Sequence, residues 1–268
     1  MSEPMETGDA LRYEHVDISY GADTIVRDIS FSLKRGEILG LVGESGSGKT
    51  TVIRAAMGLL GNFGTVSRGN IFFDGVNIPD LSAKELRAIR GAGIGMIFQD
   101  AGASLCPIRT IGEQVFESLA AHRTVSKAEP RAAALEMFEK LHFRDGERVW
   151  ESYPFELSGG MNQRAGIAIA MLLHPAVLLA DEPTSALDVV VQRQVVQEML
   201  GARNLFGTSI IIVSHDIGVV SSMADTMLVM KEGRAVEYGP TKEIIHDPQE
   251  AYTKELIAAV PRLDRKAG

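Results

Sequence analysis

Hydrophobic and polar positions change period several times along the chain, and each change marks an expected element. Residues 12–20 and 25–33 alternate loosely between apolar and polar side chains around a turn at 21–23, which predicts an antiparallel β-hairpin. Continuous apolar runs predict strands that are buried on both faces: 37–42, 177–180 and 209–213. Further short strands are expected at 69–75, at 95–98 and in a hairpin over 227–237.

The region from Thr110 to Phe143 has helical spacing with a break at Glu129-Pro130. Because it contains no strand pattern, we expect a helical subdomain, roughly 102–172, inserted in an α/β body. Other helices are expected at 82–87, where Ser82 and Glu85 have the spacing of a capping box, at 189–203 and in the tail after 241, with a break at Asp247-Pro248.

A glycine-rich turn lies between the first buried strand and an expected helix at 52–57. Its residues are Gly43, Glu44, Ser45, Gly46, Ser47, Gly48, Lys49, Thr50 and Thr51. Strand, glycine-rich turn and helix form the context of a phosphate-binding loop (P-loop), in which backbone N–H groups surround phosphate oxygens. Lys49 would contact the β- and γ-phosphates, and the Thr50 hydroxyl would be a Mg²⁺ ligand. The sequence therefore predicts binding of a nucleoside triphosphate.

A second anion-binding feature is expected at Ser158, Gly159 and Gly160. Ser158 can cap the following helix, and the two glycines leave its first N–H groups open. Ser-Gly-Gly alone is a weak motif. Together with the P-loop, however, it indicates a nucleotide shared between two chains.

Polar residues follow the buried strands. Asp181 and Glu182 end one strand, and near a P-loop they are suited to Mg²⁺ ligation and to activation of the attacking water. Gln99 and His215 lie at the ends of two other strands. Gln99 could contact Mg²⁺ or the attacking water, and His215 could form a hydrogen bond to a γ-phosphate oxygen. Taken singly, these residues could also be an ordinary turn glutamine, solvated carboxylates and a structural histidine. Tyr20, at a strand end, is either a plain strand-end aromatic or a platform for adenine.

Composition narrows the function classes. The 268 residues suffice for one large α/β domain, and the formal net charge of −8 argues against a nucleic-acid partner. Cys106 is the only cysteine, which excludes an intramolecular disulfide framework and a four-cysteine metal site. We expect no export signal, and the longest nearly apolar stretch, 166–180, is too short to span a bilayer.

Together these stretches resemble the nucleotide-binding subunit of an ATP-binding cassette (ABC) transporter, over nearly the whole chain. Residues 43–51 resemble the Walker A motif, Gln99 the Q-loop, and 177–181 with Glu182 the Walker B strand and its catalytic glutamate. Residues 157–161 resemble the family signature, with Met161 where Gln is commoner. Residues 185–188, ending at Asp188, resemble the D-loop, His215 the switch histidine, and Tyr20 the adenine-stacking aromatic.

The resemblance implies an α/β P-loop NTPase fold over 1–268, with a mainly parallel sheet, an N-terminal antiparallel β-subdomain, the inserted helical subdomain and a helical tail at roughly 241–268. It implies ATP and Mg²⁺ as cofactors, with Thr50, Gln99 and Asp181 toward the metal. Two cassettes, identical chains or paralogues, would sandwich two ATP molecules and drive two membrane permeases. An extracytoplasmic solute-binding protein would deliver the solute, and no nucleic acid would be bound. The subunit would lie peripherally on the cytoplasmic face of the inner membrane.

Within that family the chain looks most like the dipeptide, oligopeptide and nickel importers. The resemblance rests on 97–100 with Ser104, Leu105 and Pro107, on 153–161, and on 251–253 with 259–261. Departures are Ala101 for the usual proline, Cys106 for an asparagine, and Gln249-Glu250 interrupting the tail motif. The lack of a cysteine cluster after 241 favours the nickel or metallophore type modestly. The alternative is a soluble, non-transport ABC ATPase acting on ribosomes or nucleic acid. The acidic balance disfavours it, as does the lack of a second cassette or a long coiled-coil insertion.

Overall fold

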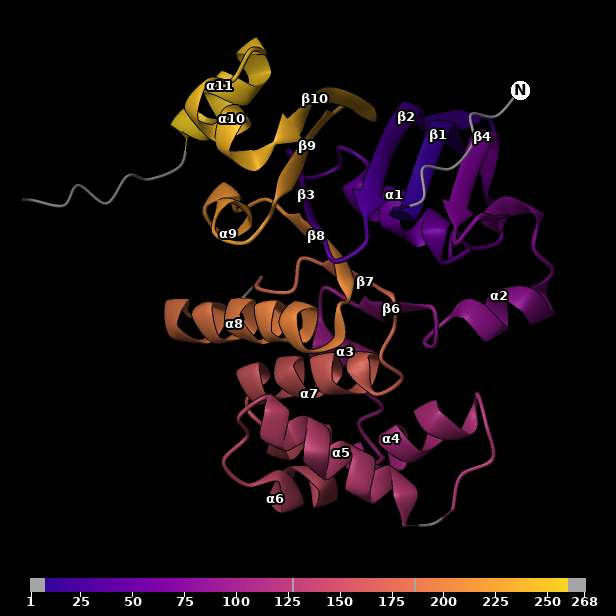
Figure 1. Cartoon of the computed structure of the whole chain (residues 1–268), viewed down its shortest axis with the longest axis vertical. Coiled ribbons are helices and arrows are strands. Elements are labelled where there is room, and N and C mark those ends of the chain that lie inside the picture. The colour runs from indigo at the N-terminus through magenta and orange to yellow at the C-terminus, as the bar shows by residue number, and fades with distance from the viewer. Residues whose placement is uncertain (1–7, 127, 186, 260–268) are drawn as a thin grey trace, which may run out of the picture.

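The computed structural model describes residues 8–126, 128–185 and 187–259. In that part of the chain the strands form two sheets (Figure 1). A four-stranded antiparallel sheet has the order β2-β1-β4-β5, and a six-stranded sheet has the order β10-β9-β3-β8-β7-β6. Neighbouring strands from β9 to β6 are parallel, and only β10 is antiparallel. The strands are β1 (Asp9–Tyr20), β2 (Asp23–Lys34), β3 (Ile38–Val42), β4 (Gly64–Phe73), β5 (Val76–Asn77), β6 (Ile94–Ile97), β7 (Val177–Asp181), β8 (Ser209–Ser214), β9 (Thr226–Lys231) and β10 (Arg234–Pro240).

The six-stranded sheet separates two hydrophobic cores. Successive residues of a strand point to opposite faces, so Ile210 and Ile212 of β8 belong to one core and Ile211 and Val213 to the other. The first core lies against the helices of residues 101–206 and those of residues 217–258, and the second joins the sheet to α1 (Lys49–Ala56) and the antiparallel sheet. Burial on both faces explains why these strands are continuous runs of Val, Ile and Leu.

Most of the remaining helices lie in two groups (Figure 1). Helices α4 to α7 lie at the lower end of the view with α8 above them, and α10 and α11 lie at the upper end beside β9 and β10, while α2 and α9 lie apart from both groups. The helices are α2 (Ala83–Ile89), α3 (Ala101–Ser104), α4 (Ile111–Ala120), α5 (Glu129–Lys140), α6 (Gly146–Glu151), α7 (Gly159–Met171), α8 (Val189–Phe206), α9 (Ile217–Ser221), α10 (Thr241–His246) and α11 (Ala251–Ala258), with 3₁₀ turns η1 (Ile78–Asp80) and η2 (Pro154–Glu156).

Most expected elements are present. The N-terminal hairpin, the buried strands and the α/β fold class are confirmed, and so is the capping box, in which Ser82 and Glu85 bond each other's backbone amides. The strand expected at 69–75 begins earlier, at Gly64, because it pairs with β1 along most of its length. The short helices α6 and α9 were not expected. The division into subdomains stays a prediction, and the tail beyond 259 lies outside the described residues.

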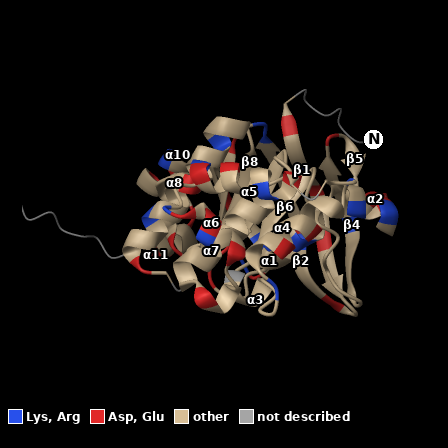
Figure 2. Cartoon of the chain, turned by 90° about the horizontal axis from the view of Figure 1, so that it is seen from below, with Lys and Arg blue, Asp and Glu red and all other residues tan. Residues whose placement is uncertain are grey.

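Charged residues of both signs are interspersed over the helices in the view of Figure 2. Among the described helices, none combines the length and the hydropathy needed to cross a membrane.

Candidate active site

Four adjacent parallel strands bring the predicted residues to one edge of the sheet. The order β3-β8-β7-β6 places the P-loop after β3, His215 after β8, Asp181 and Glu182 at the end of β7, and Gln99 after β6. Ligands of open α/β sheets bind at the carboxyl ends of the strands. Residues more than 100 positions apart in sequence therefore meet in one place.

The P-loop is shaped by glycines. Gly43 has φ 147° and Gly48 has φ 99°, and a Cβ atom on Gly43 would lie 2.1 Å from the Met230 carbonyl oxygen. Only glycine fits this close approach to β9. The loop runs directly into α1, whose first residue is Lys49. The backbone thus forms the concave turn ahead of a helix N-terminus that the sequence predicted.

Lys49 is buried within this loop. Its Nζ atom donates to the carbonyl oxygens of Gly43 at 2.8 Å and Glu44 at 2.7 Å. Burial lowers the pKa of Lys49, and the carboxylates of Glu182 and Asp181 act against that shift. The ammonium group thus lies inside the cradle, next to the backbone groups that would surround a phosphate.

Thr50 and Asp181 form a pair that suits a cation. The Thr50 hydroxyl donates to Asp181 Oδ1 at 2.8 Å. Asp181 Oδ2 is buried without a hydrogen-bond partner, and an Arg54 guanidinium nitrogen lies 3.9 Å from it. Burial raises the pKa of Asp181, and the Thr50 bond partly offsets this shift.

A hydroxyl beside an orphaned carboxylate oxygen fits a Mg²⁺ site, because Mg²⁺ prefers oxygen ligands. No cluster of three or more His, Cys, Asp or Glu residues suited to a metal occurs in the described part of the chain. Mg²⁺ is usually bound through one or two protein oxygen ligands together with phosphate oxygens and water, and the Thr50–Asp181 pair fits that mode.

Glu182 lies between Gln99 and His215. Its Oε2 atom is 3.1 Å from His215 Nδ1 and 3.5 Å from Gln99 Nε2. Glu182 has φ 45°, and its amide donates to the Val213 carbonyl at 2.9 Å. A left-handed conformation is costly for a glutamate, and such strain is concentrated at functional sites. The structure thus brings together the three residues that the sequence assigned to water activation and γ-phosphate contact.

The signature residues lie elsewhere in the molecule. Ser158 is the N-cap of α7, and its hydroxyl accepts from the Met161 amide at 3.3 Å. Ser158 and Gly159 are exposed. In Figure 1 α7 lies well apart from α1 and the P-loop. Within one chain, the two anion-binding features are therefore not brought together.

The two remaining site residues have structural contacts of their own. Asp188 caps α8, accepting from the amides of Val190 at 2.9 Å and Val191 at 3.0 Å. Tyr20 is the last residue of β1 and pairs with Gly64 of β4. A Cβ atom on Gly64 would lie 2.9 Å from the Tyr20 ring. Its adenine-stacking role stays a prediction. Ala186 of the expected D-loop lies outside the described residues.

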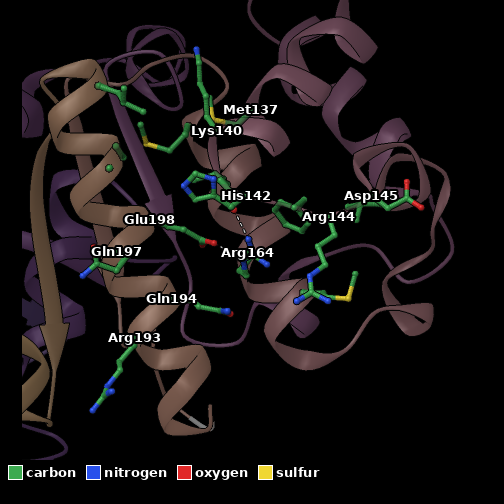
Figure 3. A pocket seen from close by; sticks show the side chains of 18 of the residues that line it. Met137, Lys140, His142, Arg144, Asp145, Arg164, Arg193, Gln194, Gln197 and Glu198 are labelled. Atoms are coloured by element: carbon green, nitrogen blue, oxygen red, sulfur yellow. Dashed lines mark hydrogen bonds and ion pairs between the residues drawn. The ribbon is translucent and has the colours of Figure 1, made fainter.

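Sequence reasoning missed a largely buried ion pair beside a cavity of about 1090 Å³ between α5, α6, α7 and α8 (Figure 3). There Arg164 of α7 pairs with Glu198 of α8, and its guanidinium also donates to the Leu141 carbonyl. The same guanidinium lies 4.3 Å from the centre of the Phe143 ring. Burial raises the pKa of Glu198 to about 7, although Arg164 lowers it. None of the predicted nucleotide-site residues lines this cavity.

Two family models match the chain. The model described as "ABC transporter" matches residues 26–185, and that described as "Oligopeptide/dipeptide transporter, C-terminal region" matches residues 236–268. The two matches together include the P-loop, the strand ends at β6 and β7, the signature helix and the tail.

The curated relatives include the glutathione import ATP-binding protein GsiA of Shigella dysenteriae, 40% identical over 277 residues, and that of Escherichia coli K12, 39% identical. Each alignment covers 100% of this chain but 44% of the relative, so the chain spans less than half of their length.

Solved structures agree in fold. One is cbiO1 from Clostridium perfringens, part of an ABC transporter complex, with TM-score 0.78, 28% identity and coverage of 90% of this chain and 92% of that one. Another is a dimeric ATP-binding cassette in a post-hydrolysis state bound to ADP and Pi. It has TM-score 0.76, 28% identity and coverage of 86% of this chain and 98% of that one.

Proposed function

Because the chain belongs to the ABC transporter family, we propose that it is the ATP-hydrolysing subunit of an importer for a small peptide-type solute. One observation carries this proposal: the P-loop, the Thr50–Asp181 pair and the Gln99–Glu182–His215 group occupy the ends of four adjacent strands. Phosphate cradle, cation ligands and water-activating carboxylate are the parts that hydrolysis of a triphosphate requires.

Each residue has a separate task in this proposal. The P-loop amides and Lys49 would hold the phosphates, while Thr50 and Asp181 would hold Mg²⁺, which would neutralise phosphate charge. Glu182 accepts a proton from the attacking water. His215 lies within hydrogen-bond distance of Glu182, orients the Glu182 carboxylate and contacts the γ-phosphate. Gln99 approaches the same carboxylate, and its side chain would contact the bound metal or the attacking water.

The reaction would take place between two cassettes. Ser158, Gly159 and Gly160 of one chain would contact the phosphates held by the P-loop of the other, because a single chain keeps these features apart. A solved relative with 28% identity is a dimer bound to ADP and Pi. Closure on ATP and opening after hydrolysis would then supply the motion for transport.

The proposed assembly places this subunit on the cytoplasmic face of the membrane, beneath two permease subunits. Large apolar side chains are exposed after β6 and in the α4 region: Phe98 at 40%, Ile108 at 82% and Phe116 at 42%. In the proposed assembly these side chains would contact a permease helix. A peptide-type solute is supported by the match at 236–268 and by relatives named for glutathione import, and the nickel alternative has no comparable support.

ATP-dependent pairing tests the proposal most directly. The variant Glu182→Gln should form dimers with Mg-ATP, measured by light scattering, and should hydrolyse ATP orders of magnitude more slowly than the wild type. Glu243→Gln, which alters a carboxylate of α10, is the matched control and should behave like the wild type. Monomeric Glu182→Gln under saturating Mg-ATP would contradict the shared-nucleotide mechanism.

The solute requires a separate assay in cells. Loss of the gene should abolish uptake of labelled glutathione or of short peptides, and a plasmid copy should restore it. Normal peptide uptake with loss of nickel uptake would instead favour the metal importers.

A further inference from the structure

The C-terminal helix α11 contacts the P-loop through Tyr252. The amide N–H of Glu44 donates to the Tyr252 hydroxyl oxygen at 3.1 Å, and Tyr252 is 8% exposed. The bond joins the start of the P-loop to a residue near the end of the chain.

The same peptide group is held from its other side by Lys49. The Glu44 N–H and the Gly43 carbonyl belong to one planar peptide unit. Lys49 Nζ donates to that carbonyl at 2.8 Å, while Tyr252 accepts from that N–H. Rotation of the peptide plane would break both bonds, and hydrogen bonds in such a chain polarise and strengthen one another. Tyr252 therefore orients the carbonyl that holds the P-loop lysine.

Tyr252 is itself held in place by the β9–β10 hairpin. The Lys231 ammonium lies 4.6 Å from the centre of the tyrosine ring. Just before α11, the amides of Gln249 and Glu250 donate to the Glu237 carboxylate of β10 at 2.8 Å and 3.3 Å.

The hairpin also bonds the loop directly, since the Gly233 amide donates to the Ser47 carbonyl at 3.1 Å. The C-terminal region thus braces the P-loop at two points.

We propose that Tyr252 is a positioning residue that orients the Gly43–Glu44 peptide for triphosphate binding and couples α11 to nucleotide occupancy. The inference rests on the proposed function, because Lys49 must exchange its carbonyl partners for phosphate oxygens when ATP binds. Tyr252 keeps the peptide in place during this exchange. Coupling between two sites is reciprocal, so a tyrosine that favours ATP binding must in turn be held more firmly when ATP is bound.

The test compares two Tyr→Phe variants, each of which removes only the hydroxyl group of one tyrosine. Tyr252→Phe keeps the ring and its contact with Lys231. Tyr238→Phe is the control, since its hydroxyl donates to the Ser32 carbonyl at 3.0 Å, away from the P-loop. The dissociation constant for AMP-PNP with Mg²⁺ should rise about two- to tenfold in Tyr252→Phe, the range expected for one lost hydrogen bond. It should stay at the wild-type value in Tyr238→Phe.

Hydrogen exchange provides the readout that a merely structural role would not alter. AMP-PNP should slow amide exchange in 251–258 of the wild type and of Tyr238→Phe, and this protection should be lost in Tyr252→Phe. An unchanged dissociation constant with unchanged protection in Tyr252→Phe would overturn the inference, as would an equal loss of affinity in Tyr238→Phe. Failure of the wild type to bind AMP-PNP would instead refute the proposed function, and the inference with it.

Discussion

The buried Arg164–Glu198 pair predicts a stability change with pH that can be isolated by one substitution. Burial raises the pKa of Glu198 from 4.5 to about 7 in the folded chain. A carboxyl with a higher pKa when folded binds its proton more tightly in that state. Its stabilising contribution is complete below pH about 4.5 and is lost as the pH rises through about 7. Applying the linkage relation to these two values gives a loss of about 2 kcal/mol between about pH 5.5 and about pH 8.

Glu198→Gln removes this titration while keeping the size of the side chain. At about pH 5.5 the folded wild type holds this carboxyl largely protonated, and the amide of the variant resembles that neutral form, so the two proteins should differ most at the higher pH. The decisive quantity is therefore the change with pH. Between about pH 5.5 and about pH 8, the free energy of unfolding measured in urea should fall by about 2 kcal/mol more in the wild type than in Glu198→Gln. Glu139→Gln, which alters an exposed carboxylate on α5, should follow the wild type. Equal losses in wild type and Glu198→Gln would refute the assignment of the raised pKa to this residue.

Three further substitutions test the nucleotide site. Glu182→Gln should bind Mg-ATP with little loss yet lower kcat by orders of magnitude, because only water activation is removed; normal turnover would exclude Glu182 from that role. Lys49→Ala should weaken ATP binding itself, measured by fluorescent nucleotide titration, and unchanged affinity would contradict the phosphate-cradle assignment. Gly159→Ala should leave the thermal midpoint within a few degrees of the wild type, because a Cβ at this position meets nothing within 4 Å. In the Glu182→Gln background it should reduce ATP-driven dimerisation, and undiminished dimerisation would argue against contact at that helix end.

The parts of the site that could be predicted share one property: their position follows from local pattern and sheet topology. Buried apolar runs gave the strands, and the polar residues that follow them had to meet, since carboxyl ends of parallel strands share an edge. Gly43 and Lys49 were recognisable because a tight phosphate loop leaves few residue choices. The capping box at Ser82 was readable for the same local reason.

The parts that could not be predicted depend on packing between distant elements. Tyr252 meets Glu44 only because the hairpin and α11 fold back over the P-loop, and no local pattern specifies that approach. Glu198 follows Gln197 on a helix whose polar residues suggest an exposed face, yet it faces Arg164 and is buried. Helices α6 and α9, of six and five residues, are too short to show a helical period.

Gly43 and Gly159 differ in whether contacts within the chain require a glycine. At Gly43 the requirement is internal, since a Cβ would lie 2.1 Å from the Met230 carbonyl oxygen of the same chain. At Gly159 a Cβ would meet nothing within 4 Å in the described part of the chain. Packing in the described part of the chain does not require a glycine at the exposed start of α7. A small residue there is compatible with our proposal that a phosphate held in the P-loop of a second cassette approaches this helix end.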